Sequence, residues 1–281
     1  MIYIILPTHK KVPTTTLFLD SIKNYLPQNY TVILIDDDAD HESSKAFSRE
    51  KNVIIVKGDG NLWWGGAINA GIDYLFKRLD PQPDDICVFA NNDVQINQST
   101  FPVIAEALDK NKNALYHPCV LNQWGEEKSA GSKVITWFPY ISRHPVDFVS
   151  EYVRIDMATA RFLCFTIQSL KKIGGISGNL PHYGGDNDFS LRAKNIGIPT
   201  FLLRKAVCTL DDRETGLSSS NIMSVADLWK SLTSTRSSNN LKFRYRFVDN
   251  YFHNPFISIM IVFSMAFTIL IKYIRNRIFK K

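Results

Sequence analysis

The sequence predicts an α/β fold with a mostly parallel, Rossmann-like sheet and helices on both of its faces. Two observations support this class: short apolar runs rich in β-branched residues alternate with helical patterns, and each run is continuously apolar. Strands of that kind are buried on both faces, as in parallel sheets. We expect strands at 2–6, 31–36, 52–56 and 85–90, and helices at 14–26, 42–50 and 64–78.

The third expected helix shows the clearest period. Trp64, Ile68, Ile72, Leu75 and Leu79 recur at spacings of four, four, three and four, which places one apolar stripe against the sheet. Later elements are expected at 100–110 (helix), 159–167 (strand) and 186–196 (helix), whereas residues 111–158 show only a weak pattern.

Composition narrows the class of protein. The chain has 281 residues, 45% hydrophobic content and a formal net charge of +6. Charges are mixed along most of the chain and the basic excess collects near the C-terminus, so we expect no nucleic-acid partner. The four cysteines share no C-x-x-C spacing and mostly lie in apolar runs, which favours buried reduced thiols. The N-terminus lacks the features of a secretory signal, so we expect a cytoplasmic body.

Polar residues follow the expected strands, where open α/β sheets bind ligands. The second strand ends in four carboxylates within five residues, namely Asp36, Asp37, Asp38 and Asp40. Asp36 comes directly after the apolar run and is best placed to accept hydrogen bonds from a base or ribose. We expect Asp38 and Asp40 to lie in a solvated turn.

The stretch GNLWWGGAINAGI (60–72) places two tryptophans against two glycines. Without Cβ atoms, Gly65 and Gly66 would let backbone N–H groups at the start of a helix approach an anion such as a diphosphate. The indole rings would wall that site. The alternative is a tight strand-to-helix turn with core aromatics. The spacing G-G-A does not match the dinucleotide-binding fingerprint.

The fourth strand ends in Asn91, Asn92 and Asp93. Side-chain oxygens at a strand end can hold a hard divalent cation whose remaining ligands come from phosphates, although polar strand ends are also common without one.

The segment PHYGGDNDFSLRAKNIG (181–197) carries the sharpest signal. Phe189, Ala193 and Ile196 form an expected inward stripe, and Asp186 lies on the same face at the helix N-terminus. Asp188 and Arg192 form an i,i+4 pair. Asp186 can act as a helix cap, a proton acceptor or both.

Taken in order, IILPTHK, ILIDDDAD, GNLWWGGAINAGI, FANNDV and LPHYGGDNDFSLRAKNIGI resemble glycosyltransferase family 2, and within it the rhamnosyltransferase-like branch. The resemblance implies a GT-A fold over residues 1–215, with a nucleotide-sugar half (1–95) and an acceptor half (96–215). It also implies transfer of a sugar from a dTDP- or UDP-linked donor, with rhamnose as one candidate sugar, and with inversion at the anomeric carbon.

The resemblance also assigns residues. Asp186 matches the catalytic base of the family's Glu-Asp pair, and Gly185 stands where the glutamate would be. The metal motif corresponds to Asn91-Asn92-Asp93, so its first acid is absent; the implied Mg²⁺ or Mn²⁺ ligands are Asp93 and Asn91. Asp211 or Asp212, after a late strand, is a further candidate ligand, and a surface turn is the alternative there. His182 is expected to contact the acceptor or a phosphate, or else to be a structural histidine, and Asp188 and Arg192 are grouped with it as acceptor or other site residues. The implied donor site comprises Thr8, Asp36, Asp37, Trp64, Gly65, Gly66, Asn69, Asn92 and Asp93.

Beyond an expected helical linker (216–254), residues 255–281 form an apolar helix with a basic tail. Its apolar run, 256–271, has sixteen residues, fewer than the roughly 20 that span a bilayer. We therefore expect a helix that lies in the interface or re-enters it, with basic residues on anionic headgroups. This peripheral attachment to the inner face of the cell membrane suits a lipid-linked or surface-polysaccharide acceptor. A core or dimer helix, and hence a homo-oligomer, is the alternative.

Two other functions fit the same motifs. One is a nucleotidyltransferase that uses the same nucleotide-binding half. The other is a catalytically silent, membrane-tethered scaffold, which the missing acids at 91 and 185 would favour.

Overall fold

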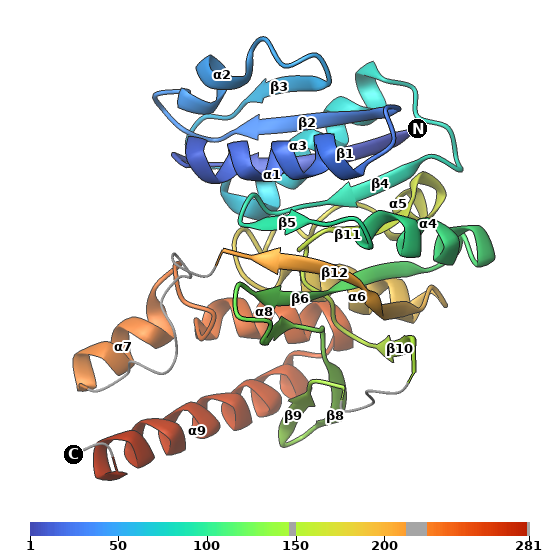
Figure 1. The fold of residues 1–281 in the computed structure, drawn as a ribbon. Coiled ribbons are helices and arrows are strands. Elements are labelled where there is room, and N and C mark those ends of the chain that lie inside the picture. The colour runs from blue at the N-terminus through green and yellow to red at the C-terminus, as the bar shows by residue number, and fades with distance from the viewer. Residues whose placement is uncertain (146–149, 212–223, 280–281) are drawn as a thin grey trace.

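The computed structural model describes residues 1–145, 150–211 and 224–279 (Figure 1). Its first part alternates strands and helices as predicted: β1 (Ile2–Thr8), α1 (Val12–Tyr25), β2 (Tyr30–Asp36), α2 (Glu42–Phe47), β3 (Val53–Lys57), α3 (Trp63–Arg78) and β4 (Ile86–Phe89). β1 pairs in parallel with β2 and β4, and β2 pairs in parallel with β3. The predicted parallel α/β core is therefore confirmed.

The second part extends the same sheet. Its elements are β5 (Val94–Ile96), α4 (Thr100–Lys110), β6 (Leu115–Asn122), β7 (Glu127–Ser129), β8 (Lys133–Trp137), β9 (Tyr140–Arg143), β10 (Tyr152–Ile155), β11 (Leu163–Thr166), α5 (Ile167–Ile173), α6 (Gly185–Asn195) and β12 (Thr200–Leu210). The main strand order is β10-β12-β6-β11-β4-β1-β2-β3, and β11 runs antiparallel to both neighbours. The weakly patterned region 111–158 thus holds β6 to β10.

Helices cover both faces of the sheet because its strands are apolar on both faces. In β1, Ile2, Ile4 and Leu6 pack with α1, α2 and α4, whereas Tyr3 and Ile5 pack with α3, α5 and α6 (Figure 1). This alternation follows the period of two along a strand.

The buried faces of α3 and α6 differ in part from the predicted apolar stripes. Ile68, Ile72 and Leu75 are buried on α3 as expected, while Trp64 and Leu79 are only half-buried. The inward position expected for Ile196 is wrong, since α6 ends at Asn195 and the Ile196 side chain is 52% exposed. All four cysteines are buried and free, as predicted.

Three helices complete the described chain: α7 (Val225–Thr233), α8 (Leu241–Phe252) and α9 (Pro255–Phe279). Residues 216–223 of the expected linker lie outside the described ranges. α8 is more than a connection, because Phe243, Phe247 and Val248 pack into a core cluster with α6 and α9. α9 lies along the lower edge of the molecule in Figure 1, beside the β8–β9 hairpin.

α9 is longer than its apolar run. The expectation that this segment is too short to span a bilayer is wrong for the helix as a whole, because α9 continues through its basic residues to 25 residues. Among the described residues it is the one helix whose length and composition would allow it to cross a membrane. Only one stripe is buried, at Ile261, Met265, Ile269 and Tyr273. Lys280 and Lys281 of the basic tail lie outside the described residues.

Candidate active site

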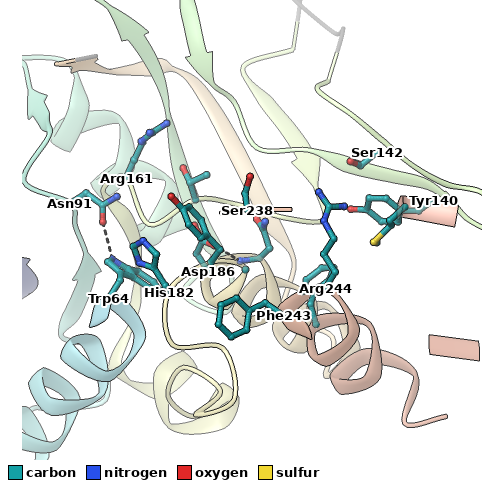
Figure 2. Close-up of a pocket in the computed structure, with 16 residues that line it drawn as sticks. Trp64, Asn91, Tyr140, Ser142, Arg161, His182, Asp186, Ser238, Phe243 and Arg244 are labelled. Atoms are coloured by element: carbon teal, nitrogen blue, oxygen red, sulfur yellow. Dashed lines mark hydrogen bonds between the residues drawn. The ribbon is translucent and has the colours of Figure 1, made fainter. Parts of the chain in front are cut away.

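A cavity of about 520 Å³ opens at the junction of the sheet, α3, α6, α8 and α9. Four predicted site residues line it: Trp64, Asn91, His182 and Asp186. In Figure 2, Trp64, Asn91 and His182 lie on one side, Tyr140 and Arg244 lie on the other, and Asp186 lies between them. Folding thus brings together polar groups that are more than a hundred positions apart in the chain.

Asp186 enters the cavity from the first turn of α6. The preceding Gly184 has a φ of +85°, a backbone conformation that favours glycine. The Asp186 carboxylate accepts hydrogen bonds from the backbone N–H of Asn187 (2.9 Å) and of Ala160 (3.4 Å). Burial raises the pKa of this carboxyl above its usual 3.8, although these hydrogen bonds and Arg161 oppose the shift. A carboxylate with a raised pKa is a stronger proton acceptor than an ordinary one.

The strand end after β4 connects to α3 through a side-chain hydrogen bond. The indole N–H of Trp64 donates to Asn91 Oδ1 at 2.9 Å. The neighbouring Trp63 packs against the His182 ring, with a centroid distance of 5.1 Å. Burial lowers the pKa of His182, and Arg236 lowers it further, so this imidazole is neutral at physiological pH and has a proton to donate.

Asp93 has the features of a cation ligand. Its Oδ1 is buried and has no hydrogen-bond partner among the described residues. Burial raises the pKa of Asp93, against the opposing effects of Arg161 and Lys11. Its backbone carbonyl accepts a hydrogen bond from the N–H of Asp211. A buried carboxylate oxygen without a described partner, two residues after Asn91 and close to Asp211 in space, fits a hard divalent cation. Asp212, the alternative ligand, lies outside the described residues.

A second acidic group lies at the end of β2. Ligand oxygens of Asp38, Asp40 and Glu42 lie within 4.8 Å of one another. The expected solvated turn is wrong for Asp38, which is fully buried, because Lys10 Nζ lies 3.6 Å from its carboxylate and offsets its charge. The Asp40 side chain is 65% exposed, as expected.

Asp36 and Asp37 play different parts. Asp36 Oδ2 accepts hydrogen bonds from the backbone N–H and the hydroxyl of Ser44, whereas its buried Oδ1 has no hydrogen-bond partner among the described residues. Both oxygens of Asp37 accept from backbone N–H groups, those of Gly60 and Trp63. Asp37 therefore closes the loop before α3, and its contact with the donor stays a prediction.

The two glycines of the tryptophan motif do not offer free amides. Gly65 N–H donates to Pro181 O at 2.7 Å, and Gly66 N–H donates to Leu62 O. A Cβ at Gly65 would lie 2.9 Å from Leu180 O. Glycine is needed at 65 because the 176–181 loop packs on the helix, which is a structural reason for this residue besides the predicted diphosphate contact.

Other predicted ligand-binding residues are engaged in the fold. The Asn69 side chain exchanges two 2.8 Å hydrogen bonds with the backbone of Ile176, which corrects its predicted donor contact. Thr8 Oγ1 donates to Ile35 O, and Asn92 Nδ2 donates to Thr15 Oγ1.

The predicted Asp188–Arg192 pair is confirmed, with Arg192 Nε 2.8 Å from Asp188 Oδ2. Asp188 is buried and accepts hydrogen bonds from Ser177, Arg192 and Asn250. Arg192 also donates to the carbonyls of Ile173 and Gly175. The pair ties α6 to the preceding loop and to α8.

The sequence also matches a known protein family. The family model described as glycosyl transferase family 2 matches residues 3–170, more than half of the chain. The chain belongs to glycosyl transferase family 2.

Solved structures of similar fold support the architecture expected for family 2. GalNAc-T7 with UDP, GalNAc and Mn²⁺ aligns with a TM-score of 0.60 at 12% identity, over 88% of this chain and 50% of that one. TarS of S. aureus aligns with a TM-score of 0.53 at 14% identity, over 89% and 43%. TarS 1-349 in complex with UDP aligns at 0.52 and 14%, over 90% and 72%. The fold is of the GT-A type, and the chain spans about half of the GalNAc-T7 chain. No curated protein matches at the sequence level.

The position of the absent glutamate has a packing explanation in this family 2 chain. A Cβ at Gly185 would lie 2.8 Å from Ile176 Cγ2 and 3.3 Å from Leu180 O. The loop that packs against Gly65 therefore leaves no room for a side chain at 185 either. Asp186 consequently has no acidic residue directly before it.

Sequence reasoning missed most of the cavity lining, including Arg161, Tyr140 and Arg244. Arg161 makes no hydrogen bond or ion pair with the described residues, yet its charge acts on both Asp93 and Asp186. The sequence signal for Arg161 was its position as a charged residue directly before the apolar run FLCFT. Tyr140 and Arg244 had no local signal, because only the packing of β9 and α8 brings them to the cavity.

Proposed function

We propose that the chain is an inverting glycosyltransferase that moves a sugar from a nucleoside diphosphate to an acceptor hydroxyl, with Asp186 as the base. The observation that carries this proposal is a carboxylate of raised pKa in the wall of a 520 Å³ cavity that also holds Trp64, Asn91 and Arg161. The UDP, GalNAc and Mn²⁺ in the GalNAc-T7 structure support a sugar-nucleotide donor.

The reaction is a single displacement. The acceptor oxygen forms a bond to the anomeric carbon while the bond from that carbon to the diphosphate oxygen breaks. Asp186 takes the hydroxyl proton, and the bonding electrons leave with the nucleoside diphosphate. In-line attack inverts the anomeric centre. A positioned base contributes about 10²- to 10⁴-fold to the rate.

Charge on the leaving group needs compensation. Asp93 and Asn91, with Asp211 beside them, would hold Mg²⁺ or Mn²⁺, which when bound neutralises negative charge on the diphosphate. Arg161, with no hydrogen bond or ion pair among the described residues, supplies a second positive charge from the bend just before β11. His182, neutral because of burial, serves as a hydrogen-bond donor to the sugar or phosphate.

The donor base is assigned to the end of β2, where Asp36 Oδ1 is buried without a described partner. An N–H of uracil or thymine would satisfy this oxygen. Both UDP- and dTDP-linked sugars carry such a group, and dTDP-rhamnose is the candidate that the motif resemblance favours.

Membrane attachment through α9 completes the proposal. Phe256 and Phe263 of α9 are 71% and 73% exposed. A helix with such a face, followed by Lys272, Arg275 and Arg277, suits the boundary between acyl chains and anionic headgroups. The enzyme would then act on the inner face of the cell membrane, on a lipid-linked or surface-polysaccharide acceptor. Replacing Phe263 and Phe267 by Glu should abolish vesicle binding; a chain that never binds vesicles and sediments as a dimer would contradict this placement.

A panel of sugar nucleotides tests the function directly. We expect one UDP- or dTDP-sugar to raise the melting temperature in the presence of Mn²⁺ or Mg²⁺, and to release nucleoside diphosphate when an acceptor is supplied. Release of pyrophosphate would instead indicate a nucleotidyltransferase. Failure of every sugar nucleotide to bind or turn over would favour a scaffold.

A further inference from the structure

A second cavity, of about 460 Å³, lies between β9, α8 and α9. It shares Tyr140, Ser142, Arg244 and Met265 with the catalytic cavity. The two cavities are therefore adjacent, and Tyr140 and Arg244 lie where they meet. Lys272, Tyr273 and Asn276 of α9 also line the second cavity.

The walls of the second cavity are amphiphilic. Ile141, Met265 and Ile269 supply apolar surface, whereas Arg244 and Lys272 supply two positive charges, and no described acidic residue lines it. Met265 and Lys272 are seven residues apart on α9, or about 10 Å along the helix axis at 1.5 Å per residue. The charged groups thus border an apolar groove rather than a polar pocket.

Arg244 is the residue of this cavity that is best suited to bind an anionic ligand. It forms no ion pair with a described carboxylate, its Nε is buried without a partner, and its one described side-chain hydrogen bond goes to Asn239 Oδ1. Burial lowers its pKa. Figure 2 shows its guanidinium beside Tyr140 at the junction of the two cavities. A half-buried guanidinium without a carboxylate is costly unless an anion completes its hydrogen bonds, and its planar fork suits phosphate oxygens.

The groove adjoins the exposed apolar face of α9. Several large side chains of α9 that do not line the groove are open to solvent, including Phe263 (73%), Phe267 (55%) and Ile271 (49%). Ser264 Oγ accepts a hydrogen bond from Tyr140 N–H, which fixes β9 against α9 and keeps the groove open beside that face.

We propose that this groove binds the phosphate and the first lipid units of a lipid-phosphate-linked acceptor, with Arg244 and Lys272 on the phosphate and the acceptor sugar directed to Asp186. The inference rests on the proposed function and names its acceptor class. The lipid remainder would enter the bilayer along α9, so the acceptor need not leave the membrane to react.

Vesicle binding of the full chain tests the groove. The probes are phosphatidylcholine vesicles doped with polyprenyl phosphate and, at equal negative charge, vesicles doped with phosphatidylglycerol. We expect the wild-type chain to bind the polyprenyl phosphate vesicles at least several-fold more tightly. Arg244→Gln should remove this preference and Lys272→Gln should weaken it. Arg275→Gln, an exposed cation of α9 outside the groove, should weaken binding to both vesicle types equally and keep the preference.

Several outcomes would overturn the groove assignment. They are equal binding of the two vesicle types by the wild-type chain, or a preference that survives both Arg244→Gln and Lys272→Gln. A third is stabilisation by soluble pyrophosphate that depends on Arg244 without any vesicle preference. Lys272 is exposed, so its variant reports on the groove even if Arg244→Gln does not fold. Sugar-nucleotide binding by the wild-type chain separates the two proposals: its absence contradicts the transferase function, whereas its presence without a lipid preference contradicts the groove alone.

Discussion

Trp64 donates its indole N–H to the side-chain oxygen of Asn91, and this 2.9 Å hydrogen bond links the first turn of α3 to the end of β4. Both residues line the catalytic cavity. The bond fixes which way the Asn91 amide faces, and so which of its atoms a ligand meets.

Trp64→Phe should therefore weaken donor binding while the ring still fills its place. Loss of one hydrogen bond, worth about 1 kcal/mol, predicts an increase of about fivefold in the KM for the sugar nucleotide. Trp63→Phe is the matched control, since the Trp63 indole makes no side-chain hydrogen bond with the described residues. Equal KM values for the two variants would contradict this role of Trp64.

Asp186→Asn should lower kcat by about 10²- to 10⁴-fold, because the amide cannot accept the hydroxyl proton. Burial raises the pKa of Asp186, so its charged form destabilises the fold as pH rises. The variant should therefore melt at the same or a higher temperature than the wild-type chain at pH 7. Asp188→Asn, two residues away, should do the opposite: it weakens the hydrogen bonds from Arg192 and Ser177 and lowers the melting temperature. A fully active Asp186→Asn would exclude the base assignment.

The pH profile gives an independent test of Asp186. A base must be deprotonated in the free enzyme, so kcat/KM should fall as pH decreases through its pKa. Since that pKa is raised, the acidic limb should lie above the 3.8 of an ordinary aspartate. Burial lowers the pKa of His182, so its titration lies below that of an ordinary histidine. Measurement of kcat/KM from pH 3 upward checks the position of the limb, and a limb at or below 3.8 would contradict the raised pKa of Asp186.

Replacement of Gly65 or of Gly66 by alanine should have different effects on the free energy of unfolding. At Gly65 the new Cβ would lie 2.9 Å from Leu180 O, a backbone atom, so Gly65→Ala should cost about 1–3 kcal/mol of unfolding free energy. At Gly66 the nearest atom is 3.4 Å away, and alanine should be neutral or stabilise α3 by about 0.5–1 kcal/mol. Urea unfolding in mild detergent measures both. Equal stabilities would contradict the close packing of the 176–181 loop on α3.

Stabilisation of the chain by Mn²⁺ should depend on Asp93. We expect Mn²⁺ to increase the melting temperature of the chain when UDP or dTDP is present, and EDTA to reverse this increase. Asp93→Asn should abolish the Mn²⁺ effect but preserve the fold, because the amide removes a buried charge that has an unpaired oxygen. Asp40→Asn is the matched control from the other acidic group. Loss of the effect in Asp40→Asn alone would assign the cation to Asp38, Asp40 and Glu42 instead.

Local patterns were sufficient for much of the fold. The apolar runs that became β1 to β4 and the period of α3 are signals that neighbouring residues carry, and the motif order was enough to indicate family 2. β6 to β10 escaped prediction because several are short and half-exposed, and the hairpin of β8 and β9 packs on α9, far along the chain.

Individual site residues were harder, because a polar side chain at a strand end can face a ligand or a distant loop. Asn69 bonds to Ile176, 107 positions away, and Asp188 bonds to Asn250, 62 positions away. Neither partner is visible in a local motif. Asp186, by contrast, was identified because its helix period and the preceding glycines directed it inward.

By itself the sequence determined the parallel α/β core, the family and the candidate base, because these depend on periodicity, burial and residue order within short segments. Only the tertiary structure decided that Gly65 and Gly185 make room for a loop, that Asn69 and Arg192 hold that loop, and that Arg244 meets the cavity of Asp186. Those outcomes depend on contacts between segments far apart in the chain, and the free energy of such contacts is set by packing that no single segment contains.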